Sequence, residues 1–141
     1  MDTSIALIRA LVENMDGPQF DRENWESFAL IIDSYEGTFN AASGYTYSPD
    51  GTISAVAADP WKVIPFVDEY VQNKYKPGES LPVKLLVQFE RTTGRYTITF
   101  EDTDVDRWKV SPATIRTIRQ ELRPVFDAPG ESSETKEVTR G

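Results

Sequence analysis

Apolar residues recur every three to four positions in three stretches of the chain, which is the spacing of one face of a helix. The stretches span residues 3–15, 60–75 and 111–123. Asp59-Pro60 and Ser111-Pro112 stand at the start of the second and third, and each combines a capping side chain with a proline suited to a first helical turn. We therefore predict three helices. Their inward-facing residues are expected to be Ile5, Ile8, Val12 and Met15, then Ile64, Val67 and Val71, then Ile115, Ile118 and Leu122.

Alternation of apolar and polar residues predicts strands between these helices. Residues 25–35, 38–48 and 52–57 form a run of three strands, and residues 83–100 form a hairpin that turns at Gly94. Strands that follow one another in this way pair antiparallel. We predict one α+β domain over residues 1–126, with a five-stranded antiparallel sheet and helices packed on one face, in the order α-β-β-β-α-β-β-α. The polar segment 127–141 is predicted to be a disordered tail.

The 141 residues include no cysteine and no histidine. This excludes thiolate nucleophiles, imidazole bases and zinc or iron sites built from sulfur and nitrogen ligands. Carboxylates, lysines and hydroxyls remain, but no pair of carboxylates stands out as an acid and a base. We therefore predict no catalytic residue, no metal and no cofactor, and a carboxylate-dependent or metal-dependent hydrolase is the least favoured alternative.

Acidic residues outnumber basic ones by 23 to 15, which gives a net charge of −8. Such a chain is repelled by a phosphate backbone and is better suited to a basic protein partner. No apolar run reaches the roughly 18 residues that cross a bilayer, and no secretory signal pattern is present. We expect a cytoplasmic protein that binds neither nucleic acid nor membrane.

An acidic cluster directly after the last predicted strand is the first candidate binding surface. It consists of Glu101, Asp102, Asp104 and Asp106. Its D-x-D-x-D spacing is that of a calcium loop, but Arg107 stands where such a loop needs glycine and Ala113 where it needs a closing glutamate. We interpret the cluster as a solvated turn, or a surface for a basic partner, rather than a cation site.

Large aromatic residues stand at the boundaries of the predicted elements, where they commonly close the ends of a core. Of these, Trp61 and Trp108 are the candidates for an interface, because tryptophans beside charges form binding hot spots. Basic residues concentrate in segment 107–123. Three of them share a face of the third helix, and we favour a solvated face over a phosphate or acidic-partner site for Arg116, Arg119 and Arg123.

Short motifs follow one another in a fixed order over residues 1–106. They are the N-terminal helix, Trp25-Glu26 opening a strand, Tyr45-Thr46-Tyr47 in the next strand, the helix after Asp59-Pro60-Trp61, and GRYTITFED at residues 94–102. In this order they resemble the YezG-like antitoxin (immunity) family of bacterial toxin systems. The last motif is similar to that family's strand of a glycine, a basic residue, alternating aromatic and apolar residues and an acidic end. The third predicted helix and the tail are additions to the family pattern.

This resemblance implies a small cytosolic protein that binds a toxin domain, typically a nuclease, and blocks its active site without catalysis. Nuclease clefts are cationic, so an acidic protein is suited to fill them. The expected contacts on this hypothesis are Glu101, Asp102, Asp104 and Asp106, with Trp108 and Trp61. The alternative left open is an interaction domain or a homodimer that pairs through an exposed sheet face or edge.

Overall fold

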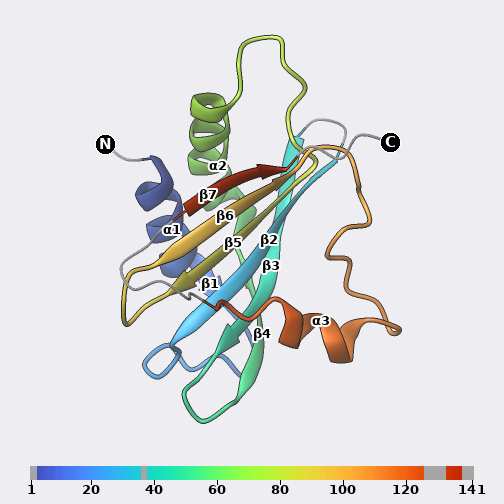
Figure 1. Ribbon diagram of the computed structural model, residues 1–141. Coiled ribbons are helices and arrows are strands. Elements are labelled where there is room, and N and C mark those ends of the chain that lie inside the picture. The colour runs from blue at the N-terminus through green and yellow to red at the C-terminus, as the bar shows by residue number, and fades with distance from the viewer. Residues whose placement is uncertain (1–2, 36–37, 126–132, 138–141) are drawn as a thin grey trace.

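The computed structural model describes residues 3–35, 38–125 and 133–137. These residues form one sheet with α1 (Thr3–Asn14) and α2 (Pro60–Lys74) on one face and α3 (Ile115–Glu121) on the other (Figure 1). The strand order is β1-β4-β3-β2-β5-β6-β7. The strands are β1 (Met15–Asp16), β2 (Ser27–Tyr35), β3 (Thr38–Tyr47), β4 (Ile53–Ala58), β5 (Lys84–Glu90), β6 (Tyr96–Glu101) and β7 (Ser133–Glu137).

The α+β class is confirmed, as is antiparallel pairing among β1 to β6. The prediction of five strands is wrong, because the described residues contain two more. The two-residue strand β1 pairs with the end of β4, where the sequence predicted the end of a helix. Strand β7 pairs parallel with β6 inside the segment that was predicted to be a tail, while residues 127–132 and 138–141 lie outside the described residues. Both strands lie at an edge of the sheet and pair through backbone hydrogen bonds. Such bonds do not require an alternation of apolar and polar side chains, so no pattern in the sequence indicated these strands.

The prediction that all helices lie on one face of the sheet is also wrong. Strand β2 is buried on both sides, since Phe28 and Leu30 belong to the core under α1 and α2 while Ala29 and Ile31 face the α3 side. The sequence of β2 agrees with this double burial, because apolar residues stand at both its odd and its even positions. The face of the sheet that was expected to meet solvent is therefore partly covered by α3.

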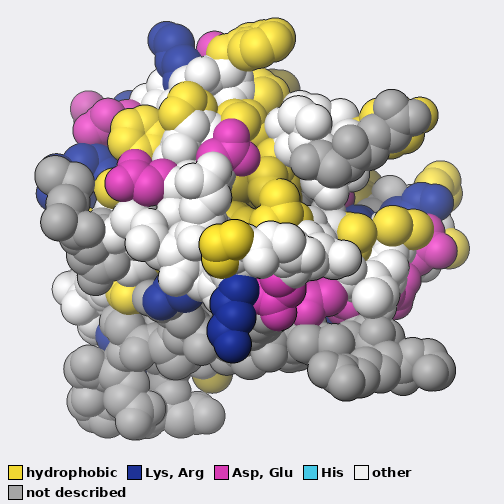
Figure 2. All heavy atoms as spheres, turned by 90° about the horizontal axis from the view of Figure 1, so that it is seen from above, with side chains coloured by type: hydrophobic (Ala, Val, Ile, Leu, Met, Phe, Trp, Pro, Cys, Tyr) yellow, Lys and Arg dark blue, Asp and Glu magenta, His cyan; other side chains and the backbone are white. Residues whose placement is uncertain are grey.

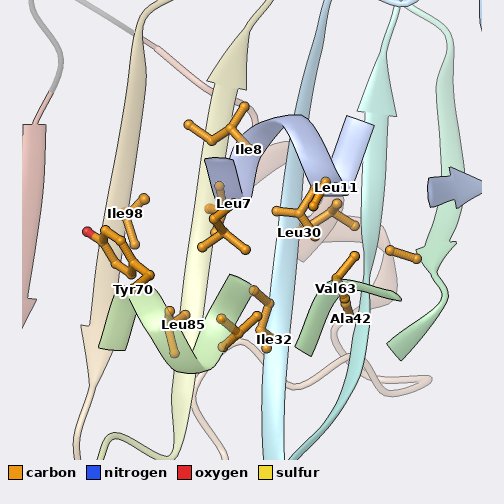
Figure 3. Packing of buried hydrophobic residues seen from close by; sticks show 14 of the residues in the cluster. Leu7, Ile8, Leu11, Leu30, Ile32, Ala42, Val63, Tyr70, Leu85 and Ile98 are labelled. Atoms are coloured by element: carbon orange, nitrogen blue, oxygen red, sulfur yellow. The ribbon is translucent and has the colours of Figure 1, made fainter. Parts of the chain in front are cut away.

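The main core lies between the sheet and the first two helices. Figure 3 shows side chains of the helices packed against those of the strands, among them Leu7 and Leu11 of α1, Val63 and Tyr70 of α2, and Leu30, Ile32, Leu85 and Ile98 of the sheet. The predicted inward faces are partly wrong, because Ile5 and Ile115 are exposed. On α2, Ile64 packs against the core as expected but is only partly buried, and Val63 is the fully buried residue of that turn. A three-to-four spacing fits two adjacent stripes of the same helix equally well.

A smaller core holds α3 against the opposite face, around Tyr45, Tyr47, Leu86, Ile118 and Leu122. The Tyr47 hydroxyl donates to the carbonyl of Arg119, and Gln88 Nε2 donates to the carbonyl of Leu122 at 2.8 Å. The helix begins later than predicted, because Ser111 and Thr114 form a turn in which Ser111 N donates to Thr114 Oγ1 at 2.9 Å. Among the helices of the described residues, none is long and apolar enough to cross a membrane.

Candidate functional site

Glu101 ends β6 and holds the acidic segment against the sheet. Its side chain is 1% exposed and lies 3.0 Å from Arg107 Nη1. The other carboxylate oxygen accepts from the backbone N–H of Thr103 at 3.2 Å and of Asp104 at 3.1 Å. The carboxylate thus fixes the chain that follows it. The expectation that Glu101 contacts a partner is wrong, because this side chain does not reach the surface.

The other three acids of the cluster differ in exposure. Asp102 is half-buried and accepts a hydrogen bond from the Tyr75 hydroxyl. Asp104 is exposed and accepts from Asp106 N at 2.9 Å, while Asp106 lies 3.9 Å from Lys109 Nζ. Within the described part of the chain, no three acidic residues come together as metal ligands. The predicted turn is therefore present, and Asp104 and Asp106 are its solvent-exposed carboxylates.

The loop after α2 adds a further acid to this group. Burial raises the pKa of Tyr75 far above its ordinary value, and the hydrogen bond to Asp102 and the charges of Asp102, Glu79 and Glu101 raise it further. Glu79 lines the same hollow as Tyr75, and the Tyr75 hydroxyl donates to Asp102. Tyr75 thus connects the loop after α2 to the acidic segment, although 22 residues separate Glu79 from Asp102 in the chain. We define the acidic end as Glu79, Asp102, Asp104 and Asp106 together with two apolar residues, Leu81 and Val105.

Leu81 and Val105 are 46% and 62% exposed at this acidic end. Figure 2, seen from above, shows hydrophobic and acidic side chains side by side on the end of the molecule that carries the loop after α2. A hollow of about 510 Å³ lies in that loop and is lined by Tyr75, Glu79 and Leu81 among others. Sequence reasoning missed Glu79 and Leu81, because only folding brings them to the 102–106 segment.

The tryptophans occupy three different environments. Trp25 is buried and closes one end of the core, with the Arg91 guanidinium 4.4 Å from its ring, which confirms the packing interpretation. Trp61 is 89% exposed in the first turn of α2, where Asp59 caps the helix by accepting from Trp61 N at 3.1 Å. Trp108 is half-buried on the α3 side of the sheet.

These positions divide the predicted contact set into separate surfaces. Trp61 and Tyr75 lie at opposite ends of α2, about 20 Å apart by the rise of a helix. Trp61 is therefore distant from the acidic end, whereas Trp108 lines the same hollow as Asp106 on the α3 side of the sheet. Arg116 and Arg119 of α3 and Arg123, which follows the helix, form a further exposed group, with the Arg123 guanidinium 5.9 Å from the ring of Tyr47.

Comparison of the chain with protein-family models, with curated proteins and with solved structures finds no match. The resemblance to the YezG-like family therefore depends on the short motifs of residues 1–106, and the function it implies is a proposal.

Proposed function

We propose that this chain is a non-catalytic binding protein that neutralises a basic partner, such as a nuclease-type toxin, by placing its acidic end in the partner's cationic cleft. The observation that carries this proposal is a set of four carboxylates in two segments that the hydrogen bond from Tyr75 to Asp102 joins. Asp102, Asp104 and Asp106 stand in the segment of the exposed Val105, and Glu79 lines a hollow with the exposed Leu81. Opposite charge steers the encounter, and the net charge of −8 extends this attraction beyond the contact surface. Leu81 and Val105 supply apolar area that is removed from water on binding.

The acidic end is also held in one conformation before a partner arrives. Tyr75 fixes Asp102, and Glu101 fixes the backbone of Thr103 and Asp104 through two hydrogen bonds. A surface that is ordered in advance loses little conformational entropy on binding. This supports a docking role for the segment.

A hydrolase that uses the same carboxylates is less well supported. Glu101 is engaged by Arg107 and Asp102 by Tyr75, so both acids already have structural partners. The raised pKa of Tyr75 keeps its hydroxyl protonated, which is unfavourable for a general base at neutral pH. The exposed acids Asp104 and Asp106 stand in one turn, in which Asp106 N donates a hydrogen bond to the Asp104 carboxylate.

The test takes as its partner a basic protein captured by this chain from native lysate, with growth protection and association rate as readouts. Reversal of two charges, Asp104→Lys with Asp106→Lys, is expected to slow association about tenfold or more at low salt. The matched control is Glu13→Lys with Glu69→Lys, which makes the same change in net charge at exposed positions of α1 and α2. Equal rates and equal protection for the two double variants would remove the acidic end from the interface.

A further inference from the structure

A hollow of about 390 Å³ opens on the α3 side of the sheet, under the segment 108–110 that precedes the helix. Its floor is formed by Ile31, Tyr45 and Ala55 from three neighbouring strands, and one wall is formed by Trp108. This volume lies in the range of small-molecule sites, which combine apolar walls with a few polar groups. The acidic end does not contribute to the lining, so the hollow is independent of the proposed function.

Lys84 places a buried ammonium group at one end of this hollow. Its side chain is 10% exposed, with Asp33 Oδ1 at 3.3 Å and the carbonyl of Arg107 at 2.9 Å. An ammonium group has three N–H donors, so within the described residues one donor remains for a ligand. Asp33 and Lys84 balance each other in charge, and Lys109 adds a second ammonium to the lining. Lys109 is largely exposed, and its ion pair with Asp106 spans 3.9 Å, which makes that pair weak. The residues that line the hollow therefore carry two ammonium groups and one carboxylate.

The wall of the hollow is held in an uncommon backbone conformation. Trp108 has φ 61°, which is the left-handed region that a bulky side chain rarely adopts and which costs about 1–3 kcal/mol. The conformation persists because the indole packs against the smaller core and the Arg107 guanidinium lies 4.4 Å from its ring. Backbone strain of this kind concentrates at ligand sites, and here it sets the indole beside the apolar floor.

We propose that this hollow binds a small amphipathic carboxylate, an aliphatic or aromatic acid. Its apolar body lies on Ile31, Tyr45 and Ala55 against the Trp108 indole, and its carboxylate accepts from the ammonium groups of Lys84 and Lys109. A single negative charge is the best match, because Asp33 stands at the same end of the hollow and opposes a more highly charged anion such as a phosphate.

The test follows the indole N–H signals of the three tryptophans in proton–nitrogen correlation NMR spectra of the full chain, titrated with phenylbutyrate and separately with octanoate. Trp108 is the tryptophan that lines the hollow, so Trp25 and Trp61 serve as internal controls. At least one acid is expected to give a saturable shift of the Trp108 signal. Phenylbutyramide, which has nearly the same shape without the charge, is expected to bind at least about tenfold more weakly than phenylbutyrate.

Two pairs of variants locate the binding. Ala55→Phe fills the floor of the hollow and is expected to abolish the shift of the Trp108 signal. The control is Ala57→Phe, because Ala57 lies on the same exposed face of β4 two residues further along and does not line the hollow. This control should leave the shift unchanged. Lys109→Glu, an exposed change that spares the fold, is expected to weaken binding several-fold, and Lys62→Glu on α2 is its control.

Three results would overturn the proposal. The first is no saturable Trp108 shift with either acid. The second is equal affinity for phenylbutyrate and its amide, which would show an apolar patch without charge recognition. The third is unchanged binding in both Ala55→Phe and Lys109→Glu.

Discussion

Replacement of Glu101 by alanine is expected to lower the free energy of unfolding by about 3 kcal/mol. The change removes the ion pair with Arg107 and the acceptor for two backbone N–H groups. Breaking a buried ion pair costs about 3–5 kcal/mol when the remaining charge stays buried. Here the Arg107 side chain is 30% exposed and the two freed N–H groups lie in an exposed segment, so water replaces part of what is lost and the lower end of that range applies.

Removal of the other partner, Arg107, is expected to lower the free energy of unfolding by at least as much. Arg107→Met leaves the Glu101 carboxylate buried without its counter-charge, and a buried unpaired charge is more costly than an exposed one. The double variant Glu101→Ala with Arg107→Met leaves neither charge behind. It should therefore be more stable than the sum of the single changes implies, by about 1–3 kcal/mol.

Urea unfolding followed by tryptophan fluorescence measures these differences, with the midpoint and the slope fitted for each variant. Asp106→Ala is the control within the same segment, because its ion pair with Lys109 spans 3.9 Å and both side chains are largely exposed. We expect it to change stability by less than about 0.5 kcal/mol. The reasoning fails if Glu101→Ala costs no more than this control, or if the effects at Glu101 and Arg107 simply add.

Three further changes have expected outcomes. Gly44→Ala should cost about 3 kcal/mol in urea unfolding, because a Cβ at Gly44 would lie 1.9 Å from the carbonyl oxygen of Ala29 in the neighbouring strand; a stable variant would contradict this geometry. Stability should fall as pH rises above 10.0, the ordinary pKa of tyrosine, because Tyr75 keeps its proton in the folded state after the unfolded chain has lost it. Tyr75→Phe should flatten that decline, and an unchanged slope would show that other groups cause it. Trp61→Ala should change thermal stability by no more than about 0.5 kcal/mol, because the side chain is almost fully exposed, and a larger loss would place this residue in the fold's packing.

The hairpin of β5 and β6 was predictable because its information is local. Apolar and polar residues alternate along both strands, and Gly94 supplies the positive φ that its turn requires. The start of α2 was predictable for the same reason, since Asp59 caps the helix within two residues of its own position. The start of α3 was wrong because Ser111 turns toward Thr114 before the helix begins.

The candidate surface was less predictable because it is assembled from segments that are distant in the chain. Four neighbouring acids in the sequence gave no indication that Glu101 is buried, since it stands on the face of β6 that was expected to meet solvent. Residues 102–110 fold back over that face and bring Arg107 to the carboxylate. Likewise Tyr75 reaches Asp102 only because α2 lies across the sheet.

The sequence by itself determined that the chain has three helices and a set of strands of the α+β class, and its lack of cysteine and histidine set which chemistries are excluded. The tertiary structure alone decided which helix covers which face, which carboxylates remain exposed, and that a hollow with a buried ammonium forms beside α3. The physical reason is that hydrophobic periodicity reports which side chains avoid water, whereas the partner that covers each side chain comes from another part of the chain.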